Sequence, residues 1–287
     1  MEEKKMKRVQ ITAAVLASAM LLAGCGASGS ASGTASTGKE KFRVGMECNY
    51  APFNWTTTTS GEFTKPLTSN DYCDGYDVVI ATKISEAIGR DVQIVKTDWD
   101  ALIIDLQQGN LDAIIAGMTE TPERAEQVNF TTPYYVSPEV VIVRADSGLG
   151  SIKDIQELSG KKVQGQMGTL YDTIIDDIQG VNHVAAATDF PAAINALQHG
   201  DIDAVTSELP VAIGVCTANP DLVYVQFEKG HGFTSAGDEG GVTVSIAIAK
   251  NNDALLNDVQ KALDTISEAD RQSIMEAAVK RQPATEE

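Results

Sequence analysis

Residues 113–124 read Ala-Ile-Ile-Ala-Gly-Met-Thr-Glu-Thr-Pro-Glu-Arg, and this stretch sets the pattern for the rest of the chain. The apolar run that ends at Gly117 predicts a strand, and Thr121-Pro122 predicts a helix that begins with a capping hydroxyl and a proline. The start of that helix is already positive, so the cation of Arg124 is poorly placed there unless an anion binds nearby. The stretch predicts an anion site at the bend or, alternatively, a solvated arginine on an exposed first turn.

Strand and helix patterns alternate on both sides of this stretch. Isoleucines at positions 80, 84 and 88 share one helical face and Gly89 follows them, which predicts an amphipathic helix over 77–88. The polar segment 56–74 predicts a long loop or an irregular hairpin. The alternation predicts an α/β fold with mostly parallel sheet. Further strands are predicted at 41–46, 92–95, 140–143, 162–164 and 244–249, and further helices at 100–108, 152–158, 171–178 and around 255–266 and 274–278.

The chain also contains an internal echo. Leu106-Gln-Gln-Gly-Asn-Leu-Asp-Ala-Ile114 resembles Leu197-Gln-His-Gly-Asp-Ile-Asp-Ala-Val205, each a helix end, a glycine and a strand. This predicts two similar α/β lobes, with chance recurrence of a common unit as the alternative. Ligands of open α/β sheets bind at the carboxyl ends of strands, so Arg124 and Glu208 belong to two equivalent rims. A cation on one rim and an anion on the other suit a zwitterion.

Length and charge narrow the classes of function. The chain has 287 residues, of which 43% are hydrophobic, enough for one large or two ordinary domains. Its formal net charge of -18 argues against a nucleic-acid partner, because phosphates require a basic face.

The first forty residues read as a targeting segment and a linker. Four basic residues lie between Lys4 and Arg8, before an apolar run over 11–22 that is too short to span a bilayer. This pattern predicts a signal peptide over 1–24. Cys25 at its end resembles the lipobox of bacterial lipoproteins, which implies a diacylated N-terminus on the outer face of the membrane; an ordinary signal peptide with an incidental cysteine is the alternative. Residues 25–40 are rich in glycine, serine and alanine and predict a flexible tether.

Six motifs together carry a family resemblance: Tyr50-Ala-Pro-Phe53, Gly75-Tyr-Asp77, Asp98-Trp-Asp100, residues 113–124, Gly168-Thr169 and Asp203-Ala-Val205. By these motifs the chain, from about Lys41 to the C-terminus, resembles the bacterial extracellular solute-binding proteins of family 3, the polar amino-acid binding subunits of ABC importers. The resemblance implies a periplasmic-binding-protein-like type II fold, a Venus flytrap of two α/β lobes joined by crossovers near 134–138 and 240–244. It implies a first lobe over 41–136 and 243–287 and a second over 137–242.

The resemblance implies how the common part of an amino acid is held. Arg124 takes the α-carboxylate, helped by the Thr119 hydroxyl and by the backbone N–H of Thr169, which lies where a predicted helix begins. Glu208 takes the α-ammonium at a position where most relatives carry aspartate, and Gly117 supplies backbone acceptors. These residue types fit, because a zwitterion that leaves water needs partners for both charges. The partners lie on different lobes, so binding is expected to close them.

The side-chain end of the ligand is less determined. By resemblance, Tyr50 and Trp99 sandwich the ligand's stem and Glu47 reaches its tip, although ordinary core packing is the alternative for the two rings. Together with the amide of Gln166, these groups suit a cationic tip such as that of arginine or lysine. Glutamine, cystine or another polar amino acid is the alternative ligand.

Four cysteines and three histidines raise the questions of disulfide and metal. By resemblance, the family brings the loops of Cys48 and Cys73 together, which implies a disulfide in an exported protein; two free thiols are the alternative. Cys216 reads as a buried apolar residue. The histidines lack metal-ligand spacing and no cofactor motif appears, so neither metal nor cofactor is expected.

The expected function is transport rather than catalysis. The expected partners are a free amino acid, the permease and ATPase subunits of an importer, and the membrane through the lipid anchor, with the protein itself a monomer. Two alternatives of another class are a cyclohexadienyl-type dehydratase, in which Glu47 would be the general acid, and a sensor lobe that serves a separate receptor.

Overall fold

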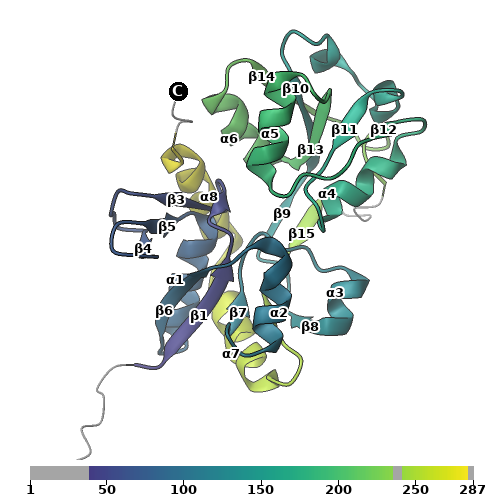
Figure 1. Cartoon of the computed structure of the whole chain (residues 1–287). Helices are drawn as coiled ribbons and strands as arrows, with labels where there is room; N and C mark the ends of the chain where they lie inside the picture. Colours follow the sequence, from purple (N-terminus) through teal and green to yellow (C-terminus); the bar gives the residue numbers. More distant parts are fainter. Residues whose placement is uncertain (1–38, 235–240, 284–287) are drawn as a thin grey trace, which may run out of the picture. The chain divides into compact units, whose positions relative to one another are not determined.

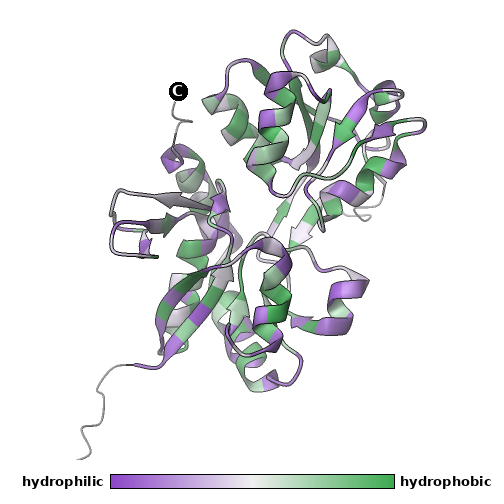
Figure 2. Cartoon of the chain, in the orientation of Figure 1, coloured by the Kyte–Doolittle hydropathy of each residue, from purple (hydrophilic) through white to green (hydrophobic). Residues whose placement is uncertain are grey.

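The computed structural model describes residues 39–234 and 241–283, which belong to one compact unit that begins at Lys39. The predicted signal peptide, the predicted lipidation site Cys25 and most of the predicted tether lie outside the described residues. Within the described ranges every helix is too short or too polar to cross a membrane. Two five-stranded sheets form the cores of two lobes (Figure 1), and hydrophobic residues lie on the strands and on the helices of both lobes (Figure 2).

The first sheet is built from both ends of the chain. β1 pairs in parallel with β6 and β7, whereas β16 lies antiparallel between β7 and β8. We call this sheet and its helices the first lobe. The strands in order are β6 (Asp91–Lys96), β1 (Lys41–Met46), β7 (Ala113–Ile114), β16 (Ala247–Ala249) and β8 (Val128–Phe130), and the helices are α1 (Tyr76–Ala87), η1 (Trp99–Ala101), α2 (Leu102–Gln107), α3 (Pro122–Gln127), α7 (Asp253–Asp264) and α8 (Glu268–Arg281).

A small four-stranded sheet adjoins the first lobe. It comprises β2 (Asn49–Tyr50), β3 (Asn54–Thr57), β5 (Tyr72–Asp74) and β4 (Lys65–Pro66) in that order. The predicted loop over 56–74 is therefore an irregular hairpin with paired strands, one of the two predicted forms. Arg281 of α8 clamps this sheet, since its guanidinium donates to both carboxylate oxygens of Asp74 at 3.0 and 2.8 Å and lies 4.4 Å from the ring centroid of Phe63.

The second sheet uses one continuous part of the chain and forms the second lobe. β11 pairs in parallel with β12 and β13, but β10 runs antiparallel to both of its neighbours, so the prediction of mostly parallel sheet was too simple. The strands in order are β12 (Asn182–His183), β11 (Lys162–Gln164), β13 (Ala204–Glu208), β10 (Glu139–Arg144) and β14 (Leu222–Gln226), and the helices are η2 (Leu149–Ser151), η3 (Ile155–Leu158), α4 (Leu170–Thr173), η4 (Ile174–Asp177), α5 (Phe190–His199) and α6 (Leu209–Ala218).

The antiparallel direction of β10 follows from its connection. β9 (Tyr135–Ser137) is separated from β10 only by Pro138, so the chain enters the second sheet from the edge at which β13 ends. β9 pairs antiparallel with β15 (Val242–Val244), and the two strands lie side by side between the sheets (Figure 1). The residues that follow the strand ends therefore meet near this two-stranded link.

The predicted echo corresponds to two matching units. α2 leads through Gly109 into β7, and α5 leads through Gly200 into β13. Gly109 and Gly200 have backbone φ values of +77° and +78°, the left-handed conformation that glycine adopts after a helix end. Both units direct the end of their strand toward the space between the lobes.

Candidate functional site

Arg124 lies in the first turn of α3, held as the sequence predicts. The Thr121 hydroxyl accepts the Arg124 backbone N–H at 3.3 Å, with Pro122 as the first helical residue. Arg124 as a whole residue is only 9% exposed, so the alternative of a solvated arginine is excluded. Nη1 donates to the Thr119 carbonyl at 2.6 Å and Nη2 to the Gly168 carbonyl at 2.9 Å. Burial lowers the pKa of Arg124 to about 10, so a buried cation remains at neutral pH.

The bend before α4 brings the second lobe to this cation. The Gly168 carbonyl accepts from Trp99 Nε1 at 3.1 Å as well as from Arg124, and the Arg124 guanidinium lies 5.1 Å from the Trp99 ring centroid. Within the bend, the backbone N–H and the hydroxyl of Thr169 donate to the Gln166 carbonyl at 3.3 and 2.8 Å. A ligand carboxylate that binds here would take over donors that now face backbone carbonyls.

Glu47 follows β1 and faces the second lobe. Glu47 is only 8% exposed, and both of its carboxylate oxygens accept from the Gln166 amide at 3.3 and 3.4 Å. Burial raises the pKa of Glu47 to about 7; the Gln166 bond opposes this rise, and the negative charges of Asp189, Asp98 and Asp100 add to it. Among the described residues Glu47 has no ion-pair partner within 4 Å. The site therefore contains a buried carboxylate that is not paired with any cation of the described residues, Arg124 included.

A hydrogen bond between Tyr50 and Glu208 also connects the two lobes, in addition to the bond between Gln166 and Glu47. The Tyr50 hydroxyl donates to Glu208 Oε1 at 2.8 Å, and the Ser137 hydroxyl of β9 donates to the other carboxylate oxygen. The Tyr50 ring stacks on Phe53 with centroids 5.7 Å apart and meets Phe190 edge-on at 5.4 Å. Burial raises the pKa of the fully buried Glu208 to about 7, and its hydroxyl partners oppose the rise.

A small cavity lies between the lobes at these residues. Its space for the centre of a water-sized sphere is about 20 Å³. All the predicted ligand-binding residues lie on its wall except Glu208, which lies behind the Tyr50 hydroxyl. The sequence prediction missed three wall residues; of these Tyr171, an aromatic residue two positions after Thr169, carried the clearest signal. The wall consists of Glu47, Tyr50, Trp99, Ala116, Gly117, Thr119, Arg124, Gln166, Thr169, Leu170 and Tyr171.

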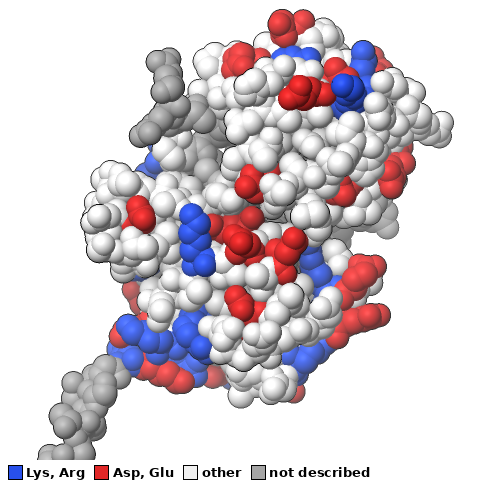
Figure 3. Space-filling view, in the orientation of Figure 1, with Lys and Arg blue, Asp and Glu red and all other residues white. Residues whose placement is uncertain are grey.

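An open groove of about 890 Å³ adjoins the cavity and shares part of its wall. Its lining includes Trp99 and Arg124 together with the acidic residues Asp100, Glu120 and Glu123. Figure 3 shows acidic side chains gathered between the two lobes on one face of the molecule. An acidic approach favours cationic ligands over anionic ones.

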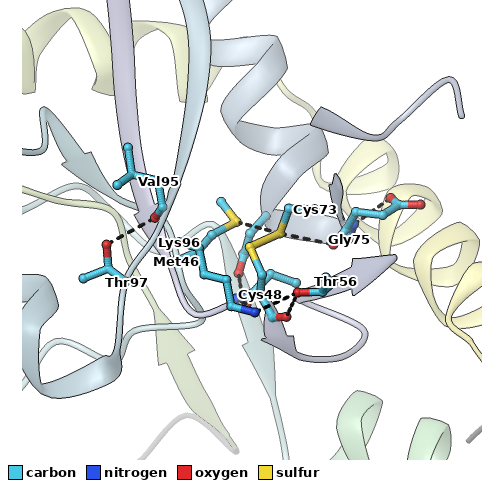
Figure 4. The surroundings of a disulfide bond; sticks show 11 residues. Met46, Cys48, Thr56, Cys73, Gly75, Val95, Lys96 and Thr97 are labelled. Carbon is cyan, nitrogen blue, oxygen red and sulfur yellow. Dashed lines mark hydrogen bonds between the residues drawn. A yellow bond between two sulfur atoms is a disulfide. The ribbon is translucent and has the colours of Figure 1, made fainter. Parts of the chain in front are cut away.

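A disulfide joins Cys48 to Cys73 directly beside Glu47, with the two Cα atoms 5.8 Å apart (Figure 4). The Cys48 carbonyl accepts from the Thr56 hydroxyl at 2.8 Å, and that hydroxyl accepts from Lys96 Nζ at 3.1 Å. The segment after Glu47 is thus fixed covalently and by hydrogen bonds. Cys216 is half-buried in α6 as a free thiol, where burial raises its pKa to about 11.

None of the three histidines lies on the wall of the cavity that the described residues form. His183 lies between Asp172 and Asp176, with 2.9 Å from each ring nitrogen to a carboxylate oxygen. Burial lowers the pKa of His183, but the two carboxylates outweigh it and hold the pKa above its ordinary value. Across the described residues, no group of three histidine, cysteine or acidic side chains is arranged to hold a metal ion.

Comparison with known proteins gives concordant matches. Residues 42–277 match the bacterial extracellular solute-binding proteins, family 3. The chain is 32% identical to a "probable histidine-binding protein" of Campylobacter jejuni, over 69% of this chain and 72% of that protein. It is 29% identical to the ABC transporter arginine-binding protein 1 of Escherichia coli, over 79% and 85% of the two chains.

Solved structures give the same result. An amino acid ABC transporter substrate-binding protein from Streptococcus pneumoniae bound to L-arginine superposes with a TM-score of 0.71 at 26% identity, covering 84% of this chain and 94% of that one. An ancestral arginine-binding protein bound to glutamine superposes with a TM-score of 0.68 at 30% identity, covering 83% and 97%.

Proposed function

The chain belongs to the bacterial extracellular solute-binding proteins, family 3, and on this premise we propose that its cleft captures an amino acid with a basic side chain. It is an amino-acid-binding component of an ABC importer rather than an enzyme, and its fold is the expected type II fold of two α/β lobes. We assign residues 41–136 and 243–287 to the first lobe and 137–242 to the second. Cys25 would carry the lipid that holds the monomeric protein at the outer face of the membrane.

The common part of the ligand would bind at the Arg124 end of the cavity. The α-carboxylate would replace the Gly168 carbonyl as partner of the guanidinium, supported by Thr119 and Thr169. The α-ammonium would be paired by Glu208 and by the backbone near Gly117. Glu208 reaches the ligand only if the Tyr50 hydroxyl gives way, so we propose that the Tyr50–Glu208 bond exchanges for the ammonium when the ligand enters.

The observation that carries the preference for a basic ligand is the buried, unpaired carboxylate of Glu47. An amino acid with a cationic tip would supply the missing charge and would stack on Trp99 and Tyr50. A neutral ligand would leave Glu47 protonated or uncompensated. Relatives of this chain are named for histidine, arginine and cystine, and solved neighbours hold arginine or glutamine, so the class of ligand agrees while its identity varies among them.

The test is calorimetric binding of arginine, lysine, histidine, glutamine and cystine to the protein and to Glu47→Gln. We expect a basic amino acid to bind best, and the substitution to weaken it at least tenfold while changing glutamine affinity little. Glu120→Gln is the matched control, because it removes an acid from the exposed rim of the groove. Preferential binding of glutamine or cystine would overturn the preference for a basic ligand, and equal loss of all ligands would overturn the role of Glu47.

A further inference from the structure

Asp77 is a fully buried carboxylate that does not lie on the wall of the ligand cavity. Asp77 is the second residue of α1 and is 0% exposed. Its Oδ2 accepts from Asn54 Nδ2 at 2.8 Å and its Oδ1 accepts from the Tyr134 hydroxyl at 2.7 Å. An ionised carboxylate can only accept, so it fixes the direction of both hydrogen bonds.

The first branch from Asp77 ends beside Glu47. Because the Asn54 amide nitrogen donates to Asp77, its oxygen faces the other way and accepts the Cys48 backbone N–H at 2.7 Å. Cys48 has a φ of +54°, a left-handed conformation that is uncommon for any residue but glycine. Such a conformation persists only where its surroundings hold it. The branch therefore helps to hold the turn from which the Glu47 side chain projects.

The second branch ends at Gly117, which follows β7, the strand next to β1, and also lies on the cavity wall. Because the Tyr134 hydroxyl donates its hydrogen to Asp77, it accepts the Gly117 backbone N–H at 2.9 Å. Gly117 has a φ of +62° and lies on the cavity wall. Tyr134 directly precedes β9, and its own carbonyl accepts from the Tyr76 hydroxyl at 2.8 Å. The branch links the cavity wall to the start of a crossover strand.

We propose that Asp77 is a positioning residue that sets two backbone turns with positive φ, at Cys48 and at Gly117, where the neighbouring strands β1 and β7 lead into the amino-acid cavity. The expected effect of Asp77 on ligand affinity rests on the proposed function, whereas its expected effect on the backbone turns does not. In Asp77→Asn, the amide nitrogen is a donor in place of one acceptor oxygen. This donor would face another donor, either the Asn54 amide or the Tyr134 hydroxyl. One branch would then have to reverse or break, although the packed volume is unchanged.

The surroundings of Asp77 agree with this role. Its burial raises the pKa of Asp77 to about 7, while the bonds from Tyr134 and Asn54 oppose the rise and the charge of Glu208 adds to it. No arginine, lysine or histidine within the described part of the chain pairs with it. The two neutral donors are thus its specific partners.

The decisive variants are Asp77→Asn and the exchanged pair Asp77→Asn with Asn54→Asp. In the exchanged pair the amide of residue 77 donates to the new carboxylate at 54, its oxygen still accepts from Tyr134, and the Cys48 N–H keeps an acceptor. Asp74→Asn is the matched control: Asp74 is also buried, at 6% exposed, but it binds Arg281 and lies away from the cavity.

Two readouts are needed, amide hydrogen exchange at Cys48 and Gly117 and calorimetric affinity for the panel of arginine, histidine, glutamine and cystine. We expect Asp77→Asn to accelerate exchange at one or both amides beyond any global change and to weaken the best ligand at least tenfold. The exchanged pair should recover both readouts, and Asp74→Asn should lower stability without changing either. Unchanged exchange in Asp77→Asn, or a folded exchanged pair that recovers neither readout, would overturn the proposal.

The experiments distinguish a failure of the proposed amino-acid binding from a failure of the proposed role of Asp77. If the protein binds none of these amino acids, the proposed function fails, but the exchange rates still test the role of Asp77. If Asp77→Asn does not fold, Tyr134→Phe removes the second branch alone. Tyr134→Phe should then accelerate amide exchange at Gly117 and leave the exchange rate at Cys48 unchanged. An equal acceleration at both amides, relative to the natural protein, would contradict the proposal.

Discussion

In the proposed function, recognition of every amino acid depends on the guanidinium of Arg124. It is buried, charged at neutral pH and bonded only to backbone carbonyls within the described structure. Both acceptors are neutral, and a ligand carboxylate in their place would form a stronger, charge-assisted pair.

We therefore expect Arg124→Ala to reduce the affinity for every amino acid alike by at least a hundredfold, since the lost contact is common to all. Calorimetry with the full ligand panel measures the effect, and the thermal midpoint of the ligand-free variant shows whether the fold is retained. Loss for basic ligands alone would contradict the assignment of Arg124 to the α-carboxylate.

Glu47 gives the pH dependence a definite sign. Its folded-state pKa of about 7 lies above the ordinary 4.5, so the folded ligand-free protein holds this proton more strongly than the unfolded chain. Its contribution to stability is thus present below pH 4.5 and is lost as the pH rises through 7. A cationic ligand requires the ionised form, and its binding releases the proton.

Affinity for a basic amino acid should accordingly fall by up to about tenfold for each pH unit below 7 from Glu47 alone. The ratio of basic to neutral ligand affinity isolates this effect, because protonation of Glu208 affects all amino acids. Titrations in two buffers of different ionisation enthalpy count the released protons. A ratio that stays constant from pH 5 to 8 would contradict the pairing.

Residues differ in how far the sequence reveals them. Arg124 could be found because a Thr-Pro helix start is a local pattern and a cation there is electrostatically unusual. The burial of Glu208 behind Tyr50 could not, because it depends on Ser137 and Tyr50, which are distant in sequence. The role of Asp77 was hidden for the same reason: its partners at 54 and 134 come together only in the folded chain.

At the scale of elements, α8 is fastened to the small four-stranded sheet by one side chain. Arg281 forms a bidentate pair with Asp74, whose side chain is 9% exposed, and stacks over Phe63. Because the pair is largely shielded from water, removing one partner leaves a poorly solvated charge.

Arg281→Ala should lower the free energy of unfolding by about 2 kcal/mol, as hydrogen bonds to charged groups contribute about 1.5–3 kcal/mol. Chemical denaturation measures it, and ligand affinity should not change. Arg90→Ala is the control, because its pair with the exposed Glu40 should contribute under about 1 kcal/mol. Equal effects of the two substitutions would show that the clamp adds nothing to an ordinary surface pair.

Elements with a local signature were predicted well and those without were not. The helix predicted over 77–88 is confirmed as α1, since its apolar spacing and terminal glycine are both local. The helix predicted over 171–178 is instead a short α-helical turn followed by a 3-10 turn. The direction of β10 was missed because strand polarity depends on the connection through Pro138 rather than on the residues of the strand.

For the molecule as a whole, the cavity dictates that the lobes must move. About 20 Å³ is far too little space for any amino acid, and four side-chain contacts cross between the lobes around it. Entry therefore requires separation about the β9–β15 link, and capture requires closure.

We expect the radius of gyration in solution to decrease when a saturating amino acid is added, as small-angle X-ray scattering can measure. Arg124→Ala should show no such decrease at the same concentration. An unchanged radius for the natural protein under conditions where calorimetry proves binding would contradict closure.

The strand order of the two sheets also fixes when each half of the molecule can be completed as the chain is made. The chain emerges from its N-terminal end, so all five strands of the second sheet, residues 139–226, appear before β16, which lies between β7 and β8 of the first sheet. Domains usually finish in the order in which they are synthesised. Here the first lobe contains the first sheet strand of the chain, β1, but is completed last. The proposed amino-acid cleft can therefore form only after β16 has emerged.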